Sequence, residues 1–198
     1  DRLSMLLGFQ RVSDNTLDKT KVIEKGKGIY VYDSDGKEYI EATASFYVAS
    51  LGYQNEELID AIEEQYRKLP FFVSAMHRAP AKSIELADKL QELVPNKDAH
   101  IMFASTGSEA NDFLMKMMRF DAVAKGTPDR KTIIGRHSSY HGGTIATASL
   151  TGAHHVEFGL PIEGFRHVSQ PDYHGSRLPG ETEIEYCDRL VSEFEILI

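Results

Sequence analysis

The segment that most constrains the fold lies at residues 101–112, where a short apolar run leads directly into a polar turn and a helical pattern. The apolar run is IMFA at 101–104, and the turn reads STGSEAND at 105–112. A strand, a tight turn and a helix start are therefore predicted in that order. Such a turn places backbone N–H groups at the positive end of a helix dipole, which favours a phosphate or another anion. Because Thr106 and Glu109 also have capping-box spacing, a helix start alone can explain part of the pattern.

A second polar turn, RHSSYHGG at 136–143, follows another strand-like run, TIIG at 132–135. If the two preceding strands are neighbours in a parallel sheet, their carboxyl ends meet at one edge, and the two turns form one crevice. Gly107 in the first turn permits close approach of the backbone to a ligand. The sequence thus predicts a ligand site, with anion-binding capacity, between these turns.

Composition and charge exclude several other classes of function. The net charge of −8 and the lack of a Lys/Arg cluster argue against a nucleic-acid partner. Cys187 is the only cysteine, so no intramolecular disulfide is possible and a reducing compartment fits. No apolar run approaches membrane-spanning length, and no signal-peptide pattern stands at the N-terminus. We therefore expect a cytoplasmic protein without a membrane partner.

The rest of the chain shows alternating helical and strand patterns. Residues 1–25 predict a short helix followed by an extended arm. Strand-like runs at 29–32 and 37–40 flank DSDG at 33–36, which predicts a β-hairpin, either as local structure only or with a ligand role. A polar loop is predicted at 153–179. Helices are predicted at 55–68, 80–95, 108–126, 143–152 and 183–197. Those at 55–68 and 80–95 would serve as scaffold, and the methionine stripe of 108–126 would be core packing. After residue 54 this alternation predicts a mainly parallel α/β domain.

The turn motifs together resemble one family, the class III aminotransferases, which use pyridoxal 5′-phosphate (PLP). The similar segments are STGSEAND at 105–112, YHG at 140–142, ASLTG at 148–152, GKGIY at 26–30 and LGY at 51–53. The resemblance implies the fold type I of PLP transferases. Residues 54–198 would be the first part of its large PLP-binding α/β domain. Residues 1–53 would be an N-terminal arm and part of a small α+β domain with the β-hairpin.

The resemblance also implies a cofactor site for PLP. The backbone at Gly107 and Ser108 would bind the phosphate, and the Tyr140 ring would stack on the pyridine ring. The full set of cofactor-binding residues implied is Thr106, Gly107, Ser108, Tyr140, His141 and Gly142.

Substrate binding is implied for Phe46 and Tyr47, at the mouth of the active site. The family often has Trp where Tyr47 stands, so the shape of the substrate pocket differs here. For Phe46, packing as an ordinary core aromatic is an equal alternative.

PLP chemistry further requires a Schiff-base lysine and an acid that protonates the pyridine nitrogen. In the family both come after the position of Ile198, and no lysine here has the strand-end context that the Schiff base needs. We therefore expect no catalytic residue within this chain. The resemblance implies that the chain is the N-terminal portion of a longer enzyme, a homodimer with a shared active site.

The function implied is transfer of an amino group between an amine or amino acid donor and a keto acid or aldehyde acceptor. The alternatives are a class III relative with other PLP chemistry, a decarboxylase or an aminomutase, or a truncated, non-catalytic phosphate-binding homologue. The fingerprint Gly-x-Gly-x-x-Gly and the P-loop are both missing, which argues against a nucleotide-binding module.

Histidines raise the question of a metal site. His137 and His141 are four residues apart, and His154 and His155 are adjacent. Zinc sites need three or four converging ligands, and neither HExxH nor a cysteine pattern supplies them. No metal is expected.

Overall fold

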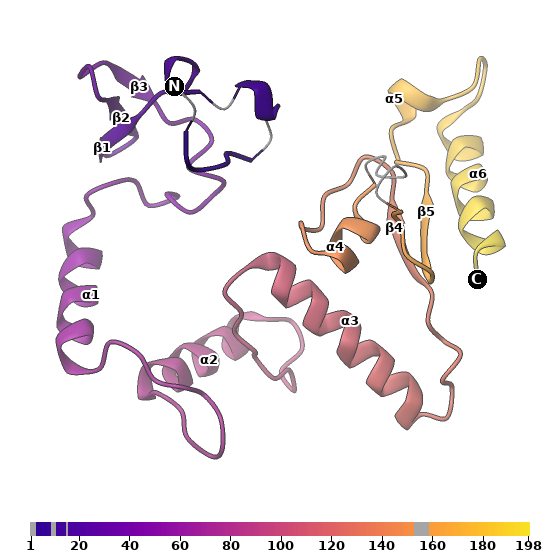
Figure 1. The fold of residues 1–198 in the computed structure, drawn as a ribbon. Coiled ribbons are helices and arrows are strands. Elements are labelled where there is room, and N and C mark those ends of the chain that lie inside the picture. Colours follow the sequence, from indigo (N-terminus) through magenta and orange to yellow (C-terminus); the bar gives the residue numbers. More distant parts are fainter. Residues whose placement is uncertain (1–2, 9–10, 15, 153–158) are drawn as a thin grey trace. The chain divides into compact units, whose positions relative to one another are not determined.

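The chain divides into two compact units, residues 1–88 and 89–198 (Figure 1). The computed structural model describes residues 3–8, 11–14, 16–152 and 159–198. Within these ranges, no helix has both the length and the apolar character needed to cross a membrane. The domain boundary between residues 53 and 54 concerns the small and large domains of the family and stays a prediction.

The first unit contains an antiparallel sheet. Its strands are β1 (Ile23–Lys27), β2 (Tyr30–Asp33) and β3 (Glu38–Ile40), in the order β1-β2-β3. The β2–β3 hairpin confirms the prediction from the sequence DSDG. The Asp33 carboxylate accepts the N–H groups of Asp35 at 3.1 Å and Lys37 at 2.9 Å, which fixes the turn.

The expectation for residues 1–25 is only partly right. Short 3-10 helices lie at Val12–Asp14 and Leu17–Lys19, but the arm that follows them forms strand β1. β1 pairs with β2 through a register shift between Ile23 and Lys25. The sequence IEKGK has no alternation of apolar and polar residues, so pairing with the open edge of β2 determines this strand, and periodicity could not reveal it.

The glycine motif at 26–28 and the LGY motif at 51–53 meet in this unit. A Cβ on Gly26 would lie only 2.4 Å from the ring of Tyr53. The backbones of Gly28 and Tyr53 exchange hydrogen bonds of 3.0 and 2.8 Å. Both motifs therefore have a local packing role, which is to fasten residues 51–53 onto the hairpin.

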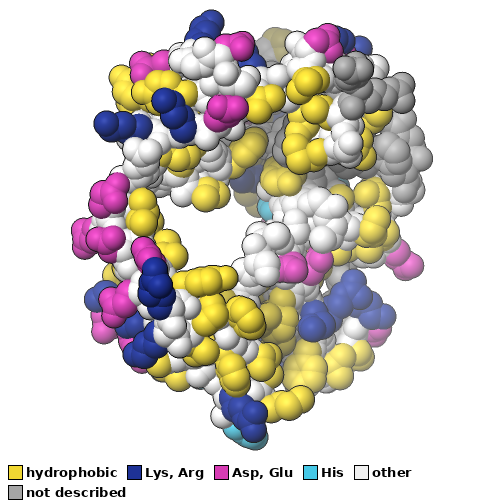
Figure 2. All heavy atoms as spheres, turned by 60° about the vertical axis from the view of Figure 1, so that its left-hand side comes forward, with side chains coloured by type: hydrophobic (Ala, Val, Ile, Leu, Met, Phe, Trp, Pro, Cys, Tyr) yellow, Lys and Arg dark blue, Asp and Glu magenta, His cyan; other side chains and the backbone are white. Residues whose placement is uncertain are grey.

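Helices α1 (Glu56–Lys68) and α2 (Ala81–Leu93) appear where the sequence predicts them. Asn55 caps α1 by accepting the N–H of Leu58 at 3.1 Å. Their apolar stripes are not covered within the described residues, since neither helix has a buried residue. Figure 2 shows hydrophobic side chains lying open on the surface. Periodicity identifies an apolar face, but it does not say which surface covers that face.

The second unit contains a parallel sheet of β4 (Ile133–Arg136) and β5 (Phe165–Val168), in register from Ile133 opposite Phe165 to Arg136 opposite Val168. This pairing confirms the predicted parallel arrangement. Helix α4 (Ile145–Leu150) packs against both strands and against α3 (Gly107–Ala124). Helix α6 (Glu183–Ile196) packs on β5, beyond the short helix α5 (Tyr173–Ser176) (Figure 1).

The core of this unit is small. Its buried apolar side chains are those of Met115, Ala122, Phe165 and Tyr186. The predicted apolar face of α3 is otherwise largely open, since Leu114 and Phe120 are exposed. The polar residues Thr147, Ser149 and Thr151 are buried instead, so polar contacts around α4 carry much of the packing.

Predictions for two segments of the second unit are wrong. Residues 101–104 form neither helix nor strand, because no described segment supplies a hydrogen-bonding partner for them. The predicted polar loop at 153–179 contains β5 and α5 among its described residues. The β5 sequence FRHV has only two apolar residues, and the strand forms because Phe165 is buried and the backbone pairs with β4.

Candidate functional site

The first turn is capped by its own side chains. Thr106 is the N-cap of α3, and its Oγ1 accepts the N–H of Glu109 at 3.1 Å. The Glu109 carboxylate reaches back to accept the N–H of Ser105 at 2.8 Å. The local explanation for this spacing is therefore correct, and a cofactor contact by Thr106 stays a prediction.

The amides of Gly107 and Ser108 follow this cap as the first two residues of α3. Helix geometry gives such amides no intrahelical acceptor. Among the described residues, no other group accepts a hydrogen bond from either N–H. A Cβ built on Gly107 would meet nothing within 4 Å, so the space beside it is open. The capped helix start thus offers adjacent donors and room for an anion.

The second turn connects β4 to α4 and carries Tyr140. The N–H of Ser138 donates to Gly152 O at 3.2 Å, and the N–H of Gly152 donates to Ser139 O at 3.0 Å. The turn is therefore fastened to the end of α4. Tyr140 itself keeps 67% of its surface exposed, which leaves its ring accessible to a ligand.

Hydrogen bonds join the two turns, although residues 101–104 before the first turn are not the neighbouring strand that the prediction assumed. The N–H of Gly143 donates to Ser108 Oγ at 3.1 Å. Asn111 Nδ2 donates to His141 O at 2.8 Å, and Thr144 Oγ1 donates to Asp112 Oδ1 at 3.0 Å. The open amides of Gly107 and Ser108 and the turn that carries Tyr140 consequently belong to one candidate site at the start of α3.

Gly142 is essential to this close approach. Its φ of +139° lies in a region that L side chains rarely adopt. A Cβ there would also lie 2.4 Å from Ser108 Oγ and 2.5 Å from Thr147 Oγ1. The predicted cofactor role of Gly142 stays untested, whereas its role in joining the turns follows directly from the contacts.

Threonines in α4 and at its two ends hydrogen-bond to one another and to the second turn. The N–H of His141 donates to Thr151 Oγ1 at 3.0 Å, and that hydroxyl donates to Thr147 O at 2.9 Å. Thr144 caps α4 through a reciprocal capping box with Thr147. The spacing of Thr144, Thr147 and Thr151 at i, i+3 and i+7 marks one helix face, a signal that could have identified these residues from the sequence.

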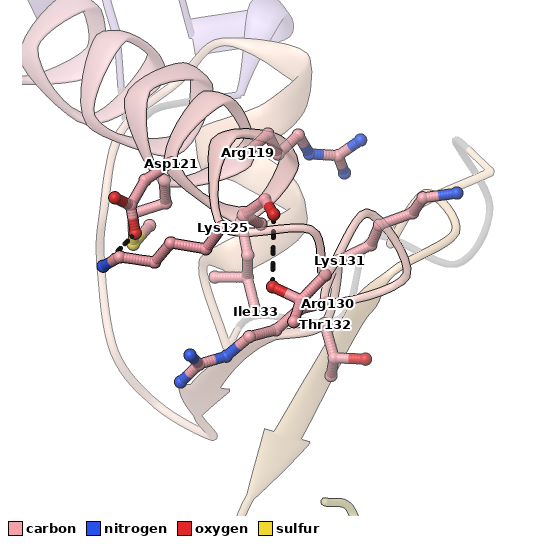
Figure 3. A pocket seen from close by; sticks show the side chains of 10 residues that line it. Arg119, Asp121, Lys125, Arg130, Lys131, Thr132 and Ile133 are labelled. Atoms are coloured by element: carbon pink, nitrogen blue, oxygen red, sulfur yellow. Dashed lines mark hydrogen bonds and ion pairs between the residues drawn. The ribbon is translucent and has the colours of Figure 1, made fainter.

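A cavity of about 260 Å³ lies at the other end of α3, where Met118 to Lys125 meet residues 127–133 (Figure 3). It is rich in basic residues, but Figure 3 shows Arg119, Arg130 and Lys131 projecting in different directions. Lys125 is paired with Asp121 at 2.8 Å. The cations of this cavity therefore do not converge on one point.

Phe46 and Tyr47 belong to the first unit, so their predicted part in substrate binding stays a prediction. Their side chains are 75% and 86% exposed. They close a run of left-handed residues that starts with Ala44 and Ser45, with φ values of 46°, 48°, 54° and 75° along the run. Such conformations cost about 1–2 kcal/mol per residue and are often found at functional loops.

No group of three or more metal-ligating side chains converges within the described residues. His137 stacks on His167 with ring centroids 5.4 Å apart, and His167 Nε2 lies 3.1 Å from Leu150 O. His154 and His155 lie outside the described residues. His137 and His167 therefore pack against each other.

Comparison with known proteins gives consistent matches. A sequence model described as Aminotransferase class-III matches residues 12–197. The chain is 41% identical over 180 residues to gamma-aminobutyrate transaminase 1, mitochondrial, from Oryza sativa subsp. japonica, covering 89% of this chain and 35% of that protein. It is 38% identical over 157 residues to putrescine–pyruvate aminotransferase from Pseudomonas aeruginosa, covering 78% of this chain and 34% of that protein.

Among solved structures, the omega transaminase from Pseudomonas jessenii in complex with PMP matches with a TM-score of 0.92 and 42% identity. The match covers 97% of this chain and 43% of that one. The chain thus spans well under half the length of these relatives.

Proposed function

Since the chain belongs to the class-III aminotransferases, we propose that the protein carrying it transfers amino groups with PLP as cofactor. The acceptor is a keto acid or an aldehyde, and the donor is an amine or an amino acid. One observation carries this proposal: the helix start that presents the open amides of Gly107 and Ser108 is joined to the turn that carries Tyr140, through Ser108 Oγ and the side chain of Asn111. The fold is the fold type I that the sequence predicts.

The residues present fit PLP. The amides at the start of α3 suit a phosphate, because they combine free N–H donors with the positive end of the helix dipole. The exposed ring of Tyr140 suits a flat pyridine ring. When bound, PLP supplies an electron sink that stabilises negative charge on the substrate carbon.

The chain's own residues bind and orient the cofactor. Ser108 Oγ accepts the N–H of Gly143, so the hydroxyl hydrogen remains available for donation to a phosphate oxygen. Ser108 can therefore contribute its amide and its hydroxyl to the same anion while it holds the second turn. The lysine and the acid that complete PLP chemistry are assigned to no residue of this chain.

The remaining parts of the proposal concern substrates, assembly and location. Phe46 and Tyr47 contact the substrate. The protein forms a homodimer in which both subunits contribute to the active site. It acts in the cytoplasm and binds neither nucleic acid nor a membrane. The names of the relatives support amine donors such as 4-aminobutyrate and putrescine, with pyruvate as one acceptor.

The test is amino transfer by the purified protein loaded with PLP. Incubation with 4-aminobutyrate or putrescine and with pyruvate should yield alanine in an amount equal to the amine consumed. A reaction without pyruvate is the control, and it should stop once the cofactor has accepted one amino group.

Other outcomes separate the alternatives. Release of CO₂ from amino acids without an acceptor would identify a decarboxylase and contradict amino transfer. Binding of PLP without any turnover on a broad panel of amines and keto acids would support the non-catalytic homologue.

A further inference from the structure

The side chains of Asn111 and Asp112 both leave α3 and bind the second turn on either side of Gly142. Asn111 Nδ2 lies 2.8 Å from His141 O, and Asp112 Oδ1 lies 3.0 Å from Thr144 Oγ1. Both side chains are half-buried. Neither is needed to form the helix, whose start is already capped by Thr106.

These residues share a face of α3 with Ser108, since positions i, i+3 and i+4 lie together on a helix. Ser108 Oγ accepts the N–H of Gly143 from the same turn. One helix face therefore attaches to the backbone at His141 and Gly143 and to the side chain of Thr144. The same helix carries the open amides of Gly107 and Ser108, so both halves of the site have a common rigid support.

Tyr140 is the residue directly before this attachment. The carbonyl of His141 is held by Asn111, and its N–H is held by Thr151 Oγ1 at 3.0 Å. The peptide after Tyr140 is thus held by Thr151 at the end of α4, and the next peptide, after His141, is held by Asn111 of α3. We propose that Asn111 and Asp112 are positioning residues, which set the Tyr140 ring at its working distance from the phosphate-binding amides. This inference rests on the proposed function.

The experiment compares Asp112→Leu with Asp112→Asn in the protein that carries this sequence. Both variants remove the charge, but only Asn keeps an oxygen that accepts from Thr144. Affinity is measured for PLP and, separately, for inorganic phosphate. The Asp112→Leu variant loses a hydrogen bond worth about 1 kcal/mol, so it should bind PLP roughly fivefold more weakly than the Asp112→Asn variant does. Phosphate affinity should agree within about twofold, because the amides are unchanged.

A double-mutant cycle shows whether the effect passes through Tyr140. In a Tyr140→Ala background, Asp112→Leu should cause little further loss of PLP affinity, since residues that act through one contact are not additive. Asn111→Ala should repeat this pattern independently, which keeps the test valid if Asp112→Leu fails to fold. Circular dichroism of the bound cofactor should weaken in the same variants, because the ring is then less fixed.

Several results would overturn the inference. Equal PLP affinity for the Leu and Asn variants would contradict it, and so would additive losses in the Tyr140→Ala background. Parallel losses of PLP and phosphate affinity would show that Asp112 merely stabilises the fold. If the wild type binds PLP and transfers amino groups in these cases, the proposed function stands and the positioning role alone fails. If the wild type does not bind PLP, both the proposed function and the positioning role are contradicted.

Discussion

Gly142 and Gly143 are adjacent, yet their surroundings differ sharply. A Cβ on Gly142 would collide with Ser108 and Thr147, whereas a Cβ on Gly143 would meet nothing within 4 Å. Gly142→Ala should therefore destabilise the protein by about 1–3 kcal/mol through overpacking, with added backbone strain. Gly143→Ala keeps its N–H for Ser108 and should stay within about 0.5 kcal/mol of the wild type. Denaturant unfolding measures both, and equal stability of the two variants would show that the turns do not meet as described.

Tyr140 allows a second test at this scale. Stacking contributes about 0.5–1.5 kcal/mol, so Tyr140→Ala should bind PLP roughly two- to tenfold more weakly, while Tyr140→Phe keeps the ring and most of the affinity. The shift in melting temperature on adding PLP reports this. An undiminished shift in the Ala variant would mean that Tyr140 only packs within the protein.

The contacts of a site residue could be predicted from the sequence where both partners are close together in the chain. Thr106 and Glu109 show their spacing in the sequence, and the structure confirms the cap. Asn111 and Asp112 stand in the recognised motif, but their partners are 30 and 32 residues away. Pairing over such distances depends on how α3 and the second turn pack, and local sequence does not encode that.

At the scale of elements, helices were predicted better than strands. Asn55, Thr106 and Thr182 each cap a helix with their side chains, so these helix starts follow from neighbouring residues. Strands need a partner from elsewhere in the chain. The run at 101–104 therefore pairs with no described segment despite its apolar sequence, whereas β1 and β5 form although their sequences lack a strand-like apolar pattern.

An ion pair between Arg189 of α6 and Glu181 joins this helix to the segment before it. Arg189 Nε donates to Glu181 Oε1 at 2.8 Å, and Arg189 Nη2 donates to Glu181 Oε2 at 3.0 Å. Hydrogen bonding to Arg189 lowers the pKa of the Glu181 carboxyl. The unfolded chain then binds the proton more tightly than the folded one. The pair consequently stabilises α6 above the ordinary glutamate pKa, and this stabilisation is lost as the pH falls through the lowered value.

Hydrogen exchange of α6 measured from pH 6 down to pH 3 checks this expectation. Protection should decline in the wild type as the pH falls and should be lower, with less pH dependence, in Glu181→Gln. Glu183→Gln, on the same helix but in none of the described ion pairs, should behave like the wild type. An identical pH profile for Glu181→Gln and the wild type would contradict a role for this pair.

At the scale of the whole molecule, sequence motifs predicted the family and fold type, because the resemblance rests on short contiguous turns such as 105–112 and 140–142. They did not predict which apolar faces are covered. Leu58, Ile62 and Phe120 lie on predicted stripes and remain open in the structure. Periodicity marks such faces without showing what covers them, and the chain spans only 34% to 43% of the length of the relatives compared above.

The central claim is that the amides of Gly107 and Ser108 bind the phosphate of PLP. Equilibrium dialysis of PLP and of pyridoxal, which lacks the phosphate, against wild type and Gly107→Val tests it most directly. A Cβ at this position meets nothing within 4 Å, so the added side chain extends into the space that the ligand would occupy. Charge-assisted hydrogen bonds contribute about 1.5–3 kcal/mol each, so wild type should prefer PLP at least about tenfold, and Gly107→Val should lose most of that preference. An unchanged preference for PLP over pyridoxal in Gly107→Val would place the phosphate elsewhere and contradict the account.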